Sequence, residues 1–319
     1  TKLFVGTNDG GLRMINTNTG AEEWIVYLPE FLDDMKTLMD NNSGTHFIGA
    51  DGAPSVWVVD NDNDGIIEPG NGDKVYLYIG MRRGGRSIYA FDVTPTSVLS
   101  TPSATGGITP KFLWRIQGGA AGDFAGLGET WSRPRVASIR IKCTSGDTSC
   151  DDGVSATSDS KKKTVLIFGG GYDPSQDNAF PAGADSMGNS IYIVDPLNGA
   201  LVWRVGGTGS GAPLVRSEMK YAIASDVATL DSNGDGAVDL IVANEGSNTL
   251  SVFLGNGDGT FNTAFTLATG ASPEWVIAAD LDSDLDFDLA VANRDNGDVS
   301  VFKNNGAGVF TNAQGTDRY

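Results

Sequence analysis

This chain has very little histidine and cysteine, two residue types that are common in catalytic sites. Its 319 residues include one histidine and two cysteines. His46 has no evident Ser-His-Asp or Cys-His partners, so we expect a packed or capping side chain there. Cys143 lacks the neighbouring base that a nucleophilic thiol needs. The sequence therefore predicts a protein that is not an enzyme.

Long apolar runs and an excess of positive charge are also missing. No stretch reaches the roughly 18 consecutive apolar residues that suggest a membrane-spanning helix. There is no signal peptide, so we expect a processed chain or a segment of a longer one. Twenty-two Lys and Arg residues face 40 Asp and Glu residues, which gives a net charge of −18. Nucleic acid is excluded as a partner because its phosphates need basic side chains.

The two cysteines lie close together in a polar stretch of sequence. Cys143 and Cys150 enclose only threonine, serine, glycine and aspartate. Such a pair on a surface loop predicts a disulfide in an oxidising compartment. Two free thiols are the alternative.

Glycine and short β-branched or aromatic runs are abundant. Forty-three glycines separate these runs, which is typical of an all-β protein with many turns. Helical spacing of apolar residues is found only over residues 29–39. We expect an all-β fold.

Three acidic loops share one spacing of oxygen-bearing side chains. The first acidic loop spans residues 60–68, the second 231–239 and the third 280–288. Each offers side-chain oxygens at positions 1, 3, 5 and 9 and a backbone carbonyl at position 7, a set of donors that suits Ca²⁺. The predicted metal ligands are Asp60, Asp62, Asp64, Ile66, Glu68, Asp231, Asn233, Asp235, Ala237, Asp239, Asp280, Asp282, Asp284, Asp286 and Asp288.

These loops differ from EF-hands in their flanking sequence. An EF-hand has a glutamate at position 12 and flanking helices, whereas strand-like residues come after each loop here. We expect calcium loops set in β-hairpins. The alternative is that the acidic residues only cap turns and keep the surface soluble. In the third loop, Leu285 occupies the position where glycine eases the sharp turn.

Internal repeats predict the architecture. Residues 230–261 recur 49 positions later, with four strands in each unit, which is the size of one propeller blade. Earlier units share a strand, a glycine turn and a second strand, and end on Trp24, Trp114 and Trp203. We predict a single β-propeller domain over residues 1–319, with four-stranded blades, the first of which lacks an inner strand. Five blades are recognisable, at residues 1–30, 50–117, 131–206, 221–269 and 273–313, with insertions at 94–110 and 142–163.

One basic cluster stands out in this acidic chain. Residues 82–86 contain three arginines and two glycines. The cluster predicts either a contact for an acidic partner or a solvated turn between two strands.

Six motifs follow one another along the first part of the chain, at residues 3–10, 46–54, 84–94, 127–134, 168–173 and 188–195. Taken in order, they resemble the C-terminal propeller of the PilY/PilC family of type IV pilus assembly and tip-adhesin proteins. The resemblance covers about residues 1–230 and from residue 231 gives way to a similarity to VCBS and FG-GAP calcium repeats. The early, tryptophan-ended blades also resemble those of quinoprotein dehydrogenases.

The resemblance implies a non-enzymatic, calcium-binding propeller that acts in pilus biogenesis or adhesion. It implies export through the periplasm to the pilus tip or cell surface, with minor pilins, pilus tip components and a host or neighbouring-cell surface as partners. The family links calcium occupancy to pilus extension and retraction, a role that the resemblance places on the second acidic loop. The alternatives are a secreted carbohydrate- or protein-binding propeller unrelated to pili and a quinoprotein-type dehydrogenase.

Overall fold

Five separate β-sheets make up most of the structure, a computed structural model that describes residues 2–33, 35–40, 48–96, 107–119, 121–142, 160–177, 183–217 and 219–313. Sheet neighbours are consecutive in sequence, and all pairs are antiparallel except β11 with β12. This pattern of consecutive antiparallel strands is that of propeller blades. The predicted all-β propeller fold is confirmed.

The first three blades contain three, four and five strands. Their bounds are β1 (Lys2–Gly6), β2 (Gly11–Asn16) and β3 (Glu22–Tyr27), then β4 (Ser55–Val59), β5 (Lys74–Gly80), β6 (Ser87–Asp92) and β7 (Lys111–Gln117), then β8 (Arg135–Lys142), β9 (Ser160–Gly169), β10 (Ser190–Val194), β11 (Leu201–Gly206) and β12 (Leu214–Val215).

The last two blades contain four strands each. Their bounds are β13 (Ala228–Leu230), β14 (Asp239–Asn244), β15 (Thr249–Phe253) and β16 (Phe265–Ala268), then β17 (Pro273–Ala279), β18 (Asp288–Asn293), β19 (Asp298–Asn304) and β20 (Phe310–Asn312). Helical structure in the described residues is limited to α1 (Met35–Asp40) and the short 3₁₀ turns Pro29–Phe31, Pro69–Asn71, Arg82–Gly84, Pro174–Gln176 and Glu245–Ser247. None of the helices in the described part of the chain is long and apolar enough to cross a membrane.

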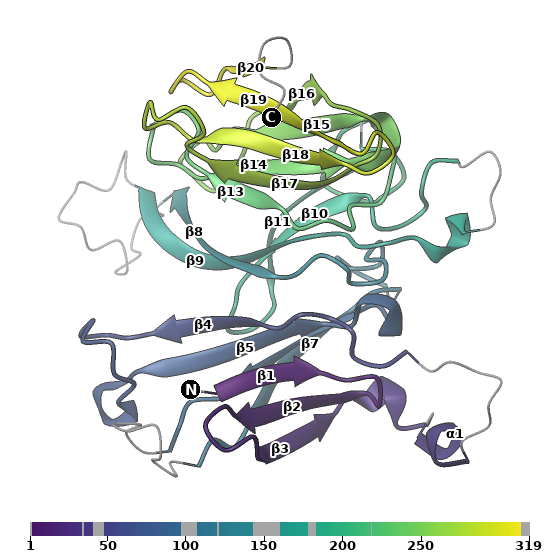
Figure 1. Cartoon of the computed structure of the whole chain (residues 1–319), viewed down its shortest axis with the longest axis vertical. Coiled ribbons are helices and arrows are strands. Elements are labelled where there is room, and N and C mark those ends of the chain that lie inside the picture. Colours follow the sequence, from purple (N-terminus) through teal and green to yellow (C-terminus); the bar gives the residue numbers. More distant parts are fainter. Residues whose placement is uncertain are drawn as a thin grey trace.

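Successive blades lie side by side in chain order. In Figure 1 the purple and blue strands β1 to β7 lie at one end of the view, and the green and yellow strands β13 to β20 lie at the other, with β8 to β11 between them. The first strands of neighbouring blades meet, since β4 contacts β8 and β13 contacts β17. The first strand of each complete blade is therefore its inner strand.

The hydrophobic core lies between blades. Four clusters of buried apolar side chains each join one blade to the next along the chain. The outer-strand tryptophans Trp24, Trp114 and Trp203 contribute to three of these clusters. Trp114 donates a hydrogen bond of 2.9 Å from Nε1 to the carbonyl oxygen of Pro196 in the third blade. Trp203 of the third blade packs on Phe261 of the fourth, with ring centroids 4.7 Å apart.

Blades four and five repeat the same internal contacts. Asn244 donates from Nδ2 to Ser251 Oγ at 2.9 Å, and its counterpart Asn293 donates to Ser300 Oγ at 2.8 Å. All four residues are buried, so each amide–hydroxyl pair satisfies polar groups that water cannot reach. The sequence duplication is thus a structural duplication.

One predicted boundary is wrong. The insertion expected over residues 142–163 overlaps the hairpin of β8 and β9, in which Arg140 pairs with Lys162 and Lys142 with Ser160. The charge of the lysine run at residues 161–163 favours an exposed loop when only the sequence is considered. A strand that protrudes beyond the core can also carry charged side chains on its solvent face, so polarity alone does not separate the two.

Candidate metal sites

The three acidic loops occupy the same place in three different blades. Each connects the inner strand to the second strand: the first acidic loop follows β4, the second β13 and the third β17. All three therefore lie at the same end of their strands. We use the term acidic-loop end for this end of the blades.

One carboxylate at the start of each loop folds the loop back on itself. The Oδ2 atom at position 1 accepts a hydrogen bond from the backbone N–H at position 6. Because this bond spans five residues, it fixes the curvature of the whole turn. The bonds are Gly65 N to Asp60 at 2.8 Å, Gly236 N to Asp231 at 2.9 Å and Leu285 N to Asp280 at 3.2 Å.

A second carboxylate, at position 5, is held by the backbone two residues later. This short bond turns the side chain toward the inside of the loop and leaves its other oxygen free for another bond. The bonds are Ile66 N to Asp64 at 2.7 Å, Ala237 N to Asp235 at 2.7 Å and Asp286 N to Asp284 at 3.0 Å.

A fully buried aspartate anchors the far side of each loop. Asp239 accepts hydrogen bonds from the amides of Ser232 and Gly255, each at 2.8 Å. Asp288 accepts from Leu281 at 2.9 Å and from Asn304 at 2.8 Å. Both carboxylates thus satisfy backbone donors inside the fold. Burial raises the pKa of Asp239.

The counterpart of these anchors in the first acidic loop is Asp73, which the spacing did not identify. Asp73 is fully buried and accepts from the amides of Asn61 at 3.0 Å and Glu68 at 2.8 Å. The amide of Asn61 is the largest cause that lowers the pKa of Asp73. Position 9 by counting is Glu68, but five further residues precede the next strand. The available signal was an aspartate at the start of that strand: Asp73 directly precedes β5, and Asp239 and Asp288 are the first residues of β14 and β18.

The backbone of the third acidic loop matches the other two despite its leucine. Position 6 is left-handed in all three loops, with φ of 80° at Gly65, 79° at Gly236 and 77° at Leu285. A left-handed leucine costs about 1–2 kcal/mol, and the Leu285 side chain is 89% exposed. The shared hydrogen bonds hold this residue in a conformation that it does not prefer.

The first and third acidic loops bring three carboxylates together. One oxygen from each of Asp60, Asp62 and Asp64 lies within 4.8 Å of the others, and the same holds for Asp280, Asp282 and Asp288. Asp60 Oδ1 is buried and has no hydrogen-bond partner in the described structure. A buried carboxylate oxygen without a partner is costly, so the donor set fits a hard cation.

The remaining predicted ligands are placed differently. Glu68 accepts a hydrogen bond from Asn71 Nδ2 at 2.6 Å. In the second acidic loop, Asn233 donates from Nδ2 to Asp235 Oδ2 at 2.9 Å. Among described residues, the second loop does not bring three carboxylates as close together as the other two loops do. Ligation by these residues, and by the carbonyls of Ile66, Ala237 and Asp286, stays a prediction.

His46, Cys143 and Cys150 lie outside the described residues. The disulfide therefore stays a prediction.

Comparison with known proteins agrees with this architecture. Residues 231–291 match the FG-GAP-like repeat family. Over 171 residues the chain is 28% identical to the type IV pilus biogenesis factor PilY1 of Pseudomonas aeruginosa strain UCBPP-PA14, covering 52% of this chain and 12% of the relative. The crystal structure of the Pseudomonas aeruginosa PilY1 C-terminal domain superposes with a TM-score of 0.56 at 17% identity, covering 97% of this chain and 58% of that one.

This chain is a β-propeller like the PilY1 C-terminal domain, with an FG-GAP-like repeat. It spans about an eighth of the length of the curated PilY1 that it matches. BamB of Moraxella catarrhalis is a more distant likeness, at 16% identity and a TM-score of 0.40, covering 97% of this chain and 56% of that one.

Proposed function

We propose that this chain is a calcium-binding, non-enzymatic domain of a type IV pilus biogenesis factor. The observation that carries the proposal is the hydrogen-bonded scaffold of the acidic loops, built three times in a propeller that is like the PilY1 C-terminal domain in sequence and in fold. The likeness supports the pilus role, and the converging carboxylates support the metal.

In this proposal the loops hold Ca²⁺ through the carboxylates that face one another. Asp60, Asp62 and Asp64 would bind one ion and Asp280, Asp282 and Asp288 another, with Asp231, Asn233 and Asp235 as the third set. A bound divalent cation supplies charge neutralisation and a crosslink between the ends of two strands. Without it, like charges inside each loop repel one another and lower the stability of the blade.

The arrangement of these carboxylates also supports a structural role over a catalytic one. Asp60 and Asp64 accept backbone N–H groups at the same time as they lie close to Asp62. Carboxylates fixed in this way are organised as a group of oxygen donors, whereas acid–base catalysis needs a proton acceptor matched to one reacting atom. A bound hard cation would use both the closely spaced carboxylates and the hydrogen bonds that hold them in place.

The proposal places the domain outside the cell, at the pilus tip or the cell surface after export through the periplasm. Extracellular calcium modules bind with dissociation constants of about 10⁻⁴–10⁻³ M, so the loops would fill after export. The proposed partners are minor pilins or pilus tip components and a host or neighbouring-cell surface.

Calorimetry on the chelated 319-residue chain tests the metal. We expect saturable calcium binding and a rise in melting temperature, because a ligand that binds only the folded state stabilises it. Asp62→Asn and Asp282→Asn should each remove one binding event. Asp258→Asn is the matched control, since Asp258 is an exposed turn aspartate outside the acidic loops whose side chain accepts from Thr260 N at 2.9 Å. A chain that binds no calcium would contradict the proposed metal.

The pilus role needs a separate test in the producing organism. Deletion of the gene should reduce surface pili and twitching motility, and the wild-type gene should restore both. If deletion leaves pilus number and motility unchanged, the pilus role is wrong whatever the calorimetry shows.

A further inference from the structure

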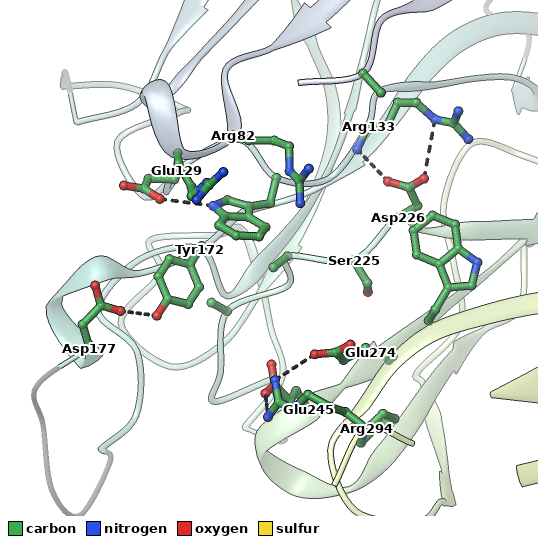
Figure 2. A pocket seen from close by; sticks show the side chains of 18 of the residues that line it. Arg82, Glu129, Arg133, Tyr172, Asp177, Ser225, Asp226, Glu245, Glu274 and Arg294 are labelled. Carbon is green, nitrogen blue, oxygen red and sulfur yellow. Dashed lines mark hydrogen bonds and ion pairs between the residues drawn. The ribbon is translucent and has the colours of Figure 1, made fainter. Parts of the chain in front are cut away.

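A cavity of about 1000 Å³ opens at the end of the blades opposite the acidic loops. Its walls come from the second, third, fourth and fifth blades, at the starts of inner strands and at the turns after second strands. Figure 2 shows Arg82, Glu129 and Tyr172 on one side of it and Glu245, Glu274 and Arg294 on another. This volume lies at the upper end of the roughly 300–1,000 Å³ of small-molecule sites. We use the term axial cavity for it.

Aromatic rings form two separate surfaces of the axial cavity. Trp131 and Tyr172 pack together with ring centroids 5.6 Å apart. Trp275, from the inner strand β17, is 46% exposed. Tryptophan left this exposed forgoes much of the apolar burial that it offers, which is typical of a binding surface.

The backbone is distorted where it presents Trp275. Ser272 adopts a left-handed conformation with φ of 55°, and β17 carries a bulge between Pro273 and Trp275. Because of the bulge, Glu274 and Trp275 are both exposed although they are consecutive in a strand. Bulges of this kind redirect side chains and are frequent beside functional sites.

Five of the nine charged side chains that line the axial cavity form ion pairs with one another. Arg133 lies 3.5 Å from Asp226, and Arg294 lies 2.7 Å from Glu245 and 2.8 Å from Glu274. Four arginines and five carboxylates line the cavity in all. The lining is therefore nearly neutral but rich in fixed hydrogen-bond donors and acceptors.

Arg82 differs from the other three arginines of the lining, of which Arg83 pairs with Asp51. The Arg82 guanidinium lies 4.6 Å from the centroid of the Trp131 ring, and Arg82 forms no ion pair within the described part of the chain. Its backbone is left-handed, with φ of 48°. Strain of this kind at a non-glycine residue persists where surrounding structure enforces it. Arg82 thus presents unused N–H donors beside an aromatic surface.

We propose that the axial cavity binds a short neutral oligosaccharide. Sugar rings have apolar faces that pack on aromatic rings, here Trp275 and the Trp131–Tyr172 pair. Their neighbouring hydroxyls donate to carboxylates and accept from guanidinium groups, which the paired charges offer together. A neutral polyol can form hydrogen bonds with both the carboxylates and the guanidinium groups and leave their ion pairs intact.

Other ligand classes fit the axial cavity less well. An anion would meet five carboxylates in a chain of net charge −18, and a cation would meet four arginines. An apolar ligand would remove the ion pairs from water without replacing their hydrogen bonds, which costs free energy. The chemistry of the lining therefore selects against charged and apolar ligands.

Titration of the 319-residue chain in calcium buffer tests the inference. The probes are neutral trisaccharides of glucose, galactose, mannose and N-acetylglucosamine, with trigalacturonic acid and trilysine as charged comparisons, followed by tryptophan fluorescence and calorimetry. We expect saturable binding of at least one neutral trisaccharide, and weaker binding of both charged probes. If no neutral probe binds, or a charged probe binds more tightly, the proposal is wrong.

Two variants locate the binding site. Trp275→Ala should weaken binding of the neutral probe by about tenfold or more, in line with loss of a central aromatic anchor, and Arg82→Ala should weaken it by a smaller factor. Phe112→Ala is the matched control, because Phe112 is an exposed aromatic residue on the outer strand β7. Melting curves establish that each variant is folded. Unchanged affinity in both cavity variants, or equal loss in Phe112→Ala, would overturn the assignment.

Discussion

The two ends of the blades are built in different ways. At the acidic-loop end, three blades repeat one scaffold, with the same carboxylate-to-backbone bonds at Asp60, Asp231 and Asp280. At the cavity end, four blades contribute different side chains to one shared space. Repetition within blades therefore suits ions that each blade can hold alone, whereas convergence between blades suits one larger ligand.

The two ends also differ in what holds them in shape. The acidic loops depend on buried carboxylates that satisfy backbone amides, as Asp239 does for Ser232 and Gly255. The axial cavity depends on partly exposed ion pairs and on the packed, mutually tilted rings of Trp131 and Tyr172. Loss of a buried acceptor costs more than loss of an exposed ion pair, so we expect larger effects of substitution at the acidic-loop end.

Asp239→Ala gives the largest expected effect. It leaves the amides of Ser232 and Gly255 without their acceptor, and we expect a loss of about 3 kcal/mol in the free energy of unfolding. Urea unfolding in chelator measures this loss apart from any metal. Asp226→Ala at the cavity end is the comparison, and should cost less. Equal losses would break the contrast between the two ends.

Leu285→Gly should increase the free energy of unfolding, whereas Asp239→Ala should decrease it. Glycine adopts the left-handed conformation of this position without strain, so we expect a gain of about 1 kcal/mol in chelator. Leu281→Gly in the same loop is the control, because Leu281 is outside the set of left-handed residues and the change should not stabilise the chain. A loss of stability in Leu285→Gly would show that the leucine side chain makes a contact worth more than the strain.

Arg294→Ala at the cavity end should have a small effect. Its ion pairs with Glu245 and Glu274 are about half exposed, and exposed pairs contribute about 0.2–1 kcal/mol. Thermal unfolding at low and high salt measures this contribution, which should shrink as salt increases. A loss as large as that of Asp239→Ala would mean that the cavity wall is part of the stabilising core.

Glu129→Gln gives the smallest effect, visible as a pH dependence. Burial raises the pKa of Glu129 above its usual value of 4.5, so the folded state favours the protonated carboxyl. The contribution of Glu129 to wild-type stability should therefore fall as pH rises from 4.5 through the folded-state pKa, because its ionisation costs more in the folded state. The glutamine variant lacks this contribution, so its stability relative to wild type should increase between pH 4 and pH 7. A constant difference across this range would contradict the shift.

The sequence was sufficient to predict the structures that form between residues close together in the chain. Strands, turns and acidic loops follow from residues close together in the chain, and the repeats predicted the propeller before any contact between blades was known. One buried residue that anchors an acidic loop is an exception. Asp73 was not predicted because an insertion moves it away from the expected position, although it lies beside the start of a strand, as Asp239 and Asp288 lie at the start of theirs.

Tertiary structure alone decided the cavity end. Arg82 meets Trp131, and Arg294 meets Glu245, only because neighbouring blades stand side by side. The arginine cluster at residues 82–86 predicted either a contact for an acidic partner or a solvated turn. In the structure its three arginines have different neighbours: Arg82 lies over the Trp131 ring, Arg83 pairs with Asp51 and Arg86 donates to the carbonyl of Leu127. Hydrogen bonds within a loop are fixed by spacing along the chain, whereas a site shared by four blades is fixed by how their cores pack.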